Sequence, residues 1–180
     1  MINGLRVRFH PPDVRRAPLN TAGAVFGYNT HIRLLRMRVA EQGESMPKTT
    51  VAAIITRHDG SDEQVLLTRR AGEPFRGQWC LPGGHFDEYE PAVDAVAREV
   101  REETGLAFAP TFFRYFDEII PEMQIHAVVL AFHGAAEGEL VAQEEEVQEV
   151  EWFSLAEARA MPLAFRHAEI VAAFADAPRS

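Results

Sequence analysis

One stretch of this 180-residue chain carries most of its structural information: GHFDEYEPAVDAVAREVREETGL, residues 84–106. A helix is predicted over residues 91–104, because Pro91 suits the first helical position, where its missing N–H would be unpaired anyway. Gly105 suits the left-handed residue just past the helix end. At 100° per residue, four apolar side chains share one face of this helix and are expected to pack against a sheet. They are Val93, Val96, Ala97 and Val100.

Three glutamates of the same helix, Glu99, Glu102 and Glu103, stand at positions i, i+3 and i+4 and fall within one arc on a different face. A solvated acidic surface is the ordinary explanation of such a run. Like charges at these spacings nevertheless cost about 0.2–0.5 kcal/mol per pair, and a divalent cation would turn that repulsion into attraction. The preceding Gly83-Gly84 pair lets a metal ion or a phosphate approach the main chain. Together these features predict a site for an oxygen-preferring cation such as Mg²⁺.

Short apolar runs on both sides of this stretch predict the rest of the fold. Strands are expected at residues 50–55, 64–69, 78–81, 111–119, 124–133 and 147–153, and the first is apolar enough to be buried on both faces. A short helix over 154–161 is expected to be capped by Ser154 and Glu157, and a last amphipathic helix to cover 164–175. This order of elements indicates a mixed α/β fold in which a sheet lies between two helix layers.

Charge divides the chain into two parts. Residues 1–46 hold seven arginines and three acids, net +4, whereas residues 47–180 hold 11 basic and 24 acidic residues, net −13. Residues 22–28 and 31–39 are typical of two strands joined at Asn29-Thr30. The first 46 residues are therefore predicted to form an arm or β-hairpin that pairs with the main domain, residues 47–180, or with a second subunit. The alternative is that Met46 is the true start.

The composition excludes several classes of protein. A net charge of −9 repels a nucleic-acid backbone, so no general nucleic-acid binding is expected. The single cysteine, Cys80, can form neither an internal disulfide nor a thiolate cluster. No apolar run approaches the roughly 18 residues of a membrane helix, and arginines interrupt the N-terminal region where a signal sequence needs an apolar core. The sequence predicts a cytoplasmic protein without a membrane partner.

The stretch 84–106 resembles the Nudix box, G-x5-E-x7-R-E-U-x-E-E-x-G-U with U aliphatic, at every defined position. The matching residues are Gly84, Glu90, Arg98, Glu99, Val100, Glu102, Glu103, Gly105 and Leu106. The resemblance extends over roughly residues 47–175 and implies an α/β/α sandwich with a mixed β-sheet. It also implies Mg²⁺- or Mn²⁺-dependent hydrolysis of a nucleoside diphosphate linked to another moiety. The intact box favours this enzyme over a Nudix-fold sensor that binds a nucleotide without cleaving it.

The resemblance implies roles for the glutamates of the box. Glu99 and Glu103 would be the main metal ligands, and Glu102 would be a third ligand or would support the other two. The carbonyl of Gly83 is a further expected ligand. Glu102 and Glu103 are also expected to take part in catalysis, because metals that neutralise a diphosphate can lower the pKa of an attacking water.

The resemblance further implies an orienting arginine and a general base. Arg98 would orient the carboxylates, with Glu90 as its ion-pair partner, and is predicted to be catalytic for that reason. In this family the base often lies in the loop before the last strand. Glu146 is the preferred base in that loop, and Glu144, Glu145 or a glutamate of the box are the alternatives.

The substrate is indicated by weaker signals. Residues 69–70, 74–79 and 162–170 look like the ADP-ribose pyrophosphatase branch of the family, although that branch usually carries an acid where this chain has Arg166. ADP-ribose or a similar small nucleotide is the expected substrate, and a nucleoside triphosphate pyrophosphohydrolase that removes damaged or surplus nucleotides is the alternative. A homodimer is expected. The residues expected to bind substrate are Arg70, Arg76, Trp79 and Gly84.

Overall fold

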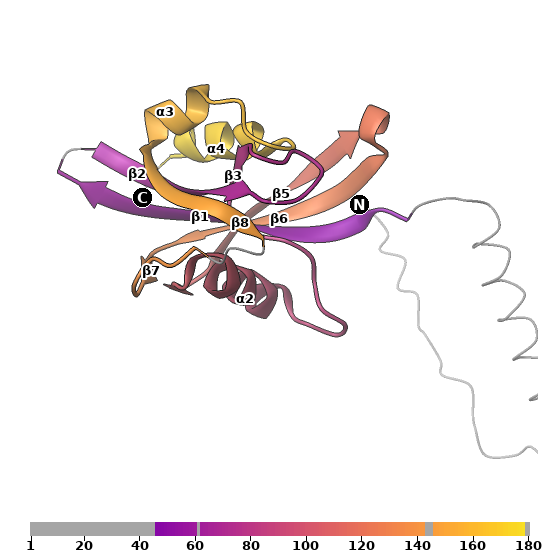
Figure 1. Cartoon of the computed structure of the whole chain (residues 1–180), viewed down its shortest axis with the longest axis horizontal. Coiled ribbons are helices and arrows are strands. Elements are labelled where there is room, and N and C mark those ends of the chain that lie inside the picture. The colour runs from indigo at the N-terminus through magenta and orange to yellow at the C-terminus, as the bar shows by residue number, and fades with distance from the viewer. Residues whose placement is uncertain (1–45, 61, 143–145, 179–180) are drawn as a thin grey trace, which may run out of the picture. The chain divides into compact units, whose positions relative to one another are not determined.

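The computed structural model describes residues 46–60, 62–142 and 146–178. The predicted arm, apart from Met46, lies outside these residues. The described elements, labelled in Figure 1, are β1 (Lys48–Asp59), β2 (Asp62–Arg70), β3 (Trp79–Cys80), α2 (Ala92–Thr104), β4 (Ala107–Phe108), β5 (Thr111–Ile120), η1 (Pro121–Met123), β6 (Ile125–Gly134), β7 (Ala136–Glu137), β8 (Val147–Ser154), α3 (Leu155–Ala160) and α4 (His167–Ala175).

A mixed six-stranded sheet forms the centre of the fold. Its strands follow the order β3-β2-β1-β6-β5, and β8 also pairs with β2. β1 runs parallel to β6 and antiparallel to β2. β1 pairs with β2 only over Thr56–Asp59, near the start of β2. At the other end of β2, Thr68 and Arg69 pair with β3 instead. In the gap that opens, the Ala53 N–H donates to the Pro82 carbonyl at 2.8 Å and the Val51 N–H donates to the Gly84 carbonyl at 2.9 Å. The loop after β3 is thereby held against the middle of the sheet.

The sheet buries both of its faces, as β1 illustrates. Val51, Ala53 and Ile55 belong to the core cluster that includes Val96 and Val100 of α2. The alternating residues of β1 belong to a second cluster with residues of α3 and α4. Figure 1 shows α2 on one side of the sheet and α3 and α4 on the other. The predicted α/β/α sandwich with a mixed sheet is therefore confirmed. Helices cover both faces of the sheet because β1 is apolar on both faces.

The helix of the quoted stretch forms as expected, with a buried face that is shifted from the predicted one. Gly105 ends it with a φ of 75°, as predicted, while Pro91 is the residue before the first turn and the helix begins at Ala92. Val93 is 51% exposed, so the predicted apolar face is wrong at this position. The buried positions include Val96, Glu99, Val100 and Glu103. Two of the three glutamates thus lie on the face that packs toward the sheet.

Other element boundaries differ from the predictions for local reasons. The capping box of α3 is present, since the Ser154 hydroxyl accepts from the Glu157 N–H and the Glu157 carboxylate accepts from the Ser154 N–H. α4 begins at His167 and not at residue 164, because Phe165 has a φ of 56°, which no right-handed helix contains. The pairing of β4 with β7 was not predicted, because strands of two residues have no recognisable periodicity.

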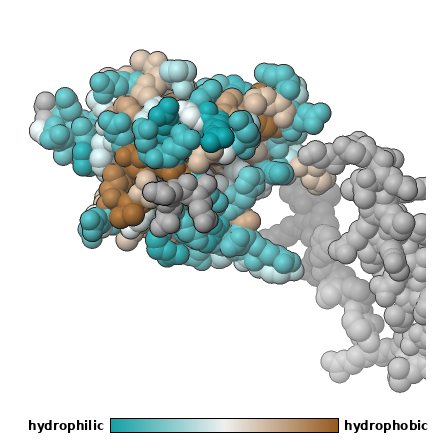
Figure 2. All heavy atoms as spheres, in the orientation of Figure 1, coloured by the Kyte–Doolittle hydropathy of each residue, from teal (hydrophilic) through white to brown (hydrophobic). Residues whose placement is uncertain are grey.

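The surface of the described part is mainly polar. Figure 2 shows a mostly hydrophilic face, with hydrophobic residues gathered beside β7. Among the described residues, no helix has the length and apolar character that crossing a membrane requires.

His167, the first residue of α4, is buried and connects this helix to the residue that follows β3. Its Nδ1 accepts a hydrogen bond from the Leu81 N–H at 3.0 Å. Burial, with a smaller effect of the Arg70 charge, lowers the pKa of His167 from 6.5 to about 4. The imidazole is therefore neutral in the folded protein at neutral pH, with its proton on Nε2.

Replacing His167 with asparagine is expected to remove part of the pH dependence of stability. Between pH 6.5 and about 4 the unfolded chain binds a proton that folded His167 does not. The wild-type free energy of unfolding should therefore fall over this range as the pH decreases, by up to roughly 3 kcal/mol. Denaturant unfolding of wild type and His167→Asn between pH 4 and 7 checks this, because the advantage of the wild type should shrink with decreasing pH. A difference that is constant with pH would contradict a buried neutral imidazole.

Candidate active site

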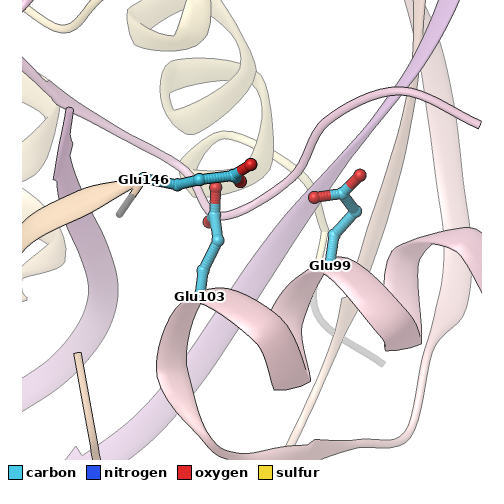
Figure 3. A group of neighbouring side chains, drawn as sticks. All are labelled: Glu99, Glu103 and Glu146. Carbon is cyan, nitrogen blue, oxygen red and sulfur yellow. The ribbon is translucent and has the colours of Figure 1, made fainter. Parts of the chain in front are cut away.

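Three carboxylates from two separate segments meet beside the sheet. Glu99 and Glu103 lie one turn apart on α2, and Glu146 directly precedes β8. Each offers an oxygen, and these atoms all lie within 4.8 Å of one another. Figure 3 shows the Glu146 carboxylate beside that of Glu103, with Glu99 extending from the same side of the helix. We call these three residues the acidic triad.

Packing of α2 positions two members of the triad. Val96 and Val100 are completely buried against the sheet, and they precede Glu99 and Glu103 by three residues each. Side chains three residues apart lie on nearly the same helix face, so burying the valines also draws the glutamates inward. Their exposed fractions are 7% for Glu99 and 8% for Glu103.

Pairing of β8 with β2 positions the third member. β8 runs beside β2 along its whole length, up to Arg70 opposite Val147. One residue further, the Ala71 N–H donates to the Glu146 carbonyl at 3.0 Å. The end of the loop is therefore held by the sheet, and the exposed Glu146 side chain reaches the two buried carboxylates.

The glycine pair makes room for the triad. Gly83 has a φ of 148°, and its N–H donates to Oε2 of Glu103 at 3.2 Å. A Cβ at Gly83 would lie 2.1 Å from the Val51 carbonyl oxygen. A Cβ at Gly84 would lie 2.6–2.7 Å from the carboxylate of Glu99. The first glycine thus permits contact with the sheet, and the second leaves the space that the Glu99 carboxylate occupies.

Arg98 connects the loop to the helix through five hydrogen bonds. Its Nε and Nη2 donate to the two oxygens of Glu90, both at 2.9 Å, which is the expected ion pair. Its Nη1 donates to Glu99 at 3.1 Å and to Glu102 at 2.9 Å. Nη2 also donates to the His85 carbonyl at 2.9 Å. A planar guanidinium can satisfy all of these acceptors at once, which fixes the orientation of Glu99.

The electrostatics of the triad favour a bound cation. Burial, together with the nearby charges of Glu99 and Glu146, raises the pKa of Glu103 to about 8, against the opposing effect of the Gly83 hydrogen bond. Burial also raises the pKa of Glu99, although the Arg98 guanidinium lowers it. By contrast, hydrogen bonding from Arg98 lowers the pKa of Glu90 to about 2. Carboxylates that repel one another in a buried site gain most from a positive ion between them.

A cleft of about 610 Å³ extends from the acidic triad. Arg70 and Lys48 bring positive charge to it, and Glu118 of β5 lines it as well. Its further described lining includes Pro74, Gln124, Ile125, His126, Phe165 and His167. The volume is in the range of small-molecule sites.

Comparison with known proteins identifies the family. Residues 46–174 match the family model of the NUDIX domain. The chain belongs to the Nudix family. The ADP-ribose pyrophosphatase of Methanocaldococcus jannaschii is 30% identical over 127 residues, which is 69% of this chain and 71% of that protein. Other curated Nudix relatives are matched over much less of their length, for example 15% of the 8-oxo-dGDP phosphatase of Danio rerio.

Solved Nudix structures share the fold. A MutT Nudix hydrolase from Burkholderia pseudomallei is 30% identical, with a TM-score of 0.61 over 71% of this chain and 96% of that one. The Nudix domain of Shewanella oneidensis NrtR, solved with ADP-ribose, is 24% identical, with a TM-score of 0.63 over 78% of this chain and 96% of that one. At this identity the second likeness concerns the fold alone.

The structure separates the metal ligands and the general base predicted for this Nudix chain into two groups. Glu99, Glu103 and Glu146 come together in the triad. Glu102 does not belong to that group of close carboxylates, because its side chain is 53% exposed and pairs with Arg98. Gly83 contacts Glu103 through its N–H. Residues 144 and 145, the alternative bases, lie outside the described residues.

The predicted substrate residues also divide. Arg70 and Gly84 line the cleft. Arg76 and Trp79 are not among the described residues that line it. Arg76 is exposed, and Trp79 packs edge-on against Phe153, with 4.9 Å between ring centroids, beside the core under α3 and α4. Trp79 therefore has a packing partner that its sequence position could not reveal.

Sequence reasoning missed Glu118 in this Nudix cleft. Glu118 lies between Phe116 and Ile120 at alternating positions of β5, which share one face of the strand. An acid in the middle of such an apolar row is the signal that could have identified it.

Proposed function

We propose that this Nudix protein is a divalent-metal-dependent pyrophosphohydrolase that cleaves nucleoside diphosphate-linked compounds, with ADP-ribose as the first candidate. The observation that carries the proposal is the acidic triad at a cleft that also contains Arg70 and Lys48. Carboxylates suit the metal, and the basic side chains suit the diphosphate. The pyrophosphatase from M. jannaschii, which is matched over 71% of its length, supports this substrate class.

The triad fits a hard divalent ion, Mg²⁺ or Mn²⁺. Three carboxylates offer oxygens within 4.8 Å, and Gly84 keeps the space beside Glu99 free of a side chain. A bound ion would supply charge neutralisation of the diphosphate and a lower pKa for the attacking water. Glu99 and Glu103 would hold it, and Arg98 would keep Glu99 oriented. The Gly83 carbonyl stays a predicted additional ligand.

Glu146 is proposed as the general base. It is the exposed member of the triad, so water can reach its carboxylate, and it stands beside the two buried glutamates. Its backbone is fixed through the Ala71 hydrogen bond. A base must lie within hydrogen-bond reach of the proton that it removes, and Glu146 meets this condition for a water that lies next to the triad.

A hydrolysis panel tests the function. The purified protein with Mg²⁺ or Mn²⁺ is expected to convert ADP-ribose and water into AMP and ribose 5-phosphate. Chromatography measures the formation of both products. NADH, sugar nucleotides and nucleoside triphosphates complete the panel. Removal of the metal with EDTA should abolish turnover, and adding Mg²⁺ back should restore it.

Two outcomes would change the proposal. Rapid pyrophosphate release from nucleoside triphosphates, with ADP-ribose untouched, would favour the triphosphate pyrophosphohydrolase. Nucleotide binding without cleavage of any compound would favour the sensor. Light scattering on the same preparation tests the predicted homodimer.

A further inference from the structure

Glu118 is a buried carboxylate that the chemistry at the acidic triad does not use. It is 5% exposed and lines the same cleft as the triad. Its Oε1 accepts a hydrogen bond from the Arg166 N–H at 3.2 Å. Burial raises its pKa, while the Arg166 hydrogen bond acts in the opposite direction. A buried carboxyl with a single backbone donor is incompletely compensated for the loss of water.

The second oxygen of Glu118 is available to a bound molecule. Within the described residues, the Arg166 N–H is its one hydrogen-bond partner. Among the described side chains, Oε2 of Glu118 is not one of the unpaired polar atoms that are completely enclosed by protein. Since the residue lines the cleft, the oxygen is open to what the cleft contains. β6 residues opposite Glu118 line the cleft too, with Ala127 directly paired to it.

The neighbouring loops have an unusual backbone that points to a binding function. Phe165 and Phe75 have φ values of 56° and 66°, a region that side chains larger than glycine seldom adopt. Their rings meet edge to face at 4.8 Å between centroids. The Arg70 guanidinium lies 4.8 Å from the centroid of Phe165 and also donates to the Pro74 carbonyl at 2.9 Å. Strained residues of this kind persist where surrounding contacts hold them, and they are frequent in ligand sites.

We propose that Glu118 accepts a hydrogen bond from an N–H or O–H donor on the nucleoside part of the substrate and thereby selects among substrates. The proposal rests on the function proposed above. The donor could be the exocyclic amine of a base or a ribose hydroxyl, since both offer the same chemistry to a carboxylate oxygen. A buried acceptor left without its donor strongly disfavours the analogue that lacks it. Glu118 is thus a specificity residue, separate from the triad that holds the metal.

Steady-state kinetics of two Glu118 variants test this proposal on three substrates. They are ADP-ribose, its analogue with hypoxanthine in place of adenine, and its analogue with 2′-deoxyribose in the nucleoside part. Glu118→Ala is expected to raise KM for ADP-ribose about tenfold to hundredfold while kcat changes by no more than about threefold. The wild type should discriminate against the analogue that lacks the relevant donor, and Glu118→Ala should lose that discrimination. Glu118→Gln keeps one acceptor oxygen and should retain part of it.

Asp117→Asn is the matched control. Asp117 is the exposed neighbour of Glu118 on the same strand, and its substitution removes a carboxylate charge of the same sign. The Asp117→Asn protein should keep the wild-type KM values and the wild-type order of substrates. Equal losses on all three substrates would assign Glu118 to holding the Arg166 turn and would overturn the proposal. An unchanged KM in an active Glu118→Ala protein would overturn it as well. If the wild type hydrolyses none of the three compounds, ADP-ribose fails as the proposed substrate and this inference fails with it.

Discussion

Glu103→Gln is expected to lower kcat by roughly a thousandfold, the scale of losing a strong electrostatic contact in the transition state, while the fold survives. The variant keeps an oxygen that can accept the Gly83 N–H, and it removes a carboxyl whose burial beside Glu99 and Glu146 disfavours ionisation. The free energy of unfolding of the metal-free protein should therefore stay the same or rise. Turnover at saturating Mg²⁺, thermal unfolding and circular dichroism measure these effects.

Two further variants make the comparison specific. Asp94→Asn removes the same charge from the first turn of α2, outside the triad, and should leave turnover unchanged. Glu102→Gln should lose far less than Glu103→Gln, because Glu102 lies outside the triad. Wild-type turnover in Glu103→Gln would reject the triad as the catalytic centre, and an unfolded variant would show that Glu103 has a structural role.

Gly83→Ala and Gly84→Ala are expected to fail in different ways. A Cβ at Gly83 would meet the backbone of Val51 and Ala52, in a conformation that alanine rarely adopts, so the variant should lose roughly 2–5 kcal/mol of stability. A Cβ at Gly84 would meet the carboxylate of Glu99, which can move. Gly84→Ala should therefore remain folded and lose turnover. Chemical unfolding and kinetics of both variants separate these effects.

Gly72→Ala and Gly77→Ala provide matched controls. A Cβ at Gly72 has no neighbouring atom within 4 Å, so this variant should be as stable as the wild type within about 0.5 kcal/mol. Gly77 has equally open surroundings but a φ of 79°, so its variant isolates the cost of backbone strain. Equal losses for Gly77→Ala and Gly83→Ala would show that contact with β1 contributes nothing.

Much of the fold could be predicted because its local signals agree. The β1 run is apolar on both faces, the Ser154–Glu157 pair caps α3, and Gly105 ends α2. The error at Val93 has a physical origin. Periodicity gives the direction of an apolar face but does not show how far along the helix the sheet extends, and Val93 lies in the first turn, where it remains exposed.

The candidate site could be predicted less completely. Spacing on one helix brings Glu99 and Glu103 together, but it equally includes Glu102, which tertiary packing leaves outside. The contacts of Glu146 depend on the pairing of β8 with the distant β2, and those of Glu118 depend on the turn before α4, whose Arg166 N–H it accepts. A two-residue strand such as β3 gives no sign of which face Trp79 occupies. Trp79 was predicted to bind substrate from the resemblance of residues 74–79 to the ADP-ribose pyrophosphatase branch, whereas the structure packs it against Phe153.

The guanidinium of Arg98 also constrains how this sequence can evolve. Its five hydrogen bonds join Glu90, Glu99, Glu102 and the His85 carbonyl into one network. Removing any one partner changes what the others contribute, so the effects of substitutions at these positions cannot be additive. Because of this epistasis, the effect of a substitution at one of these positions depends on which of the other partners is present.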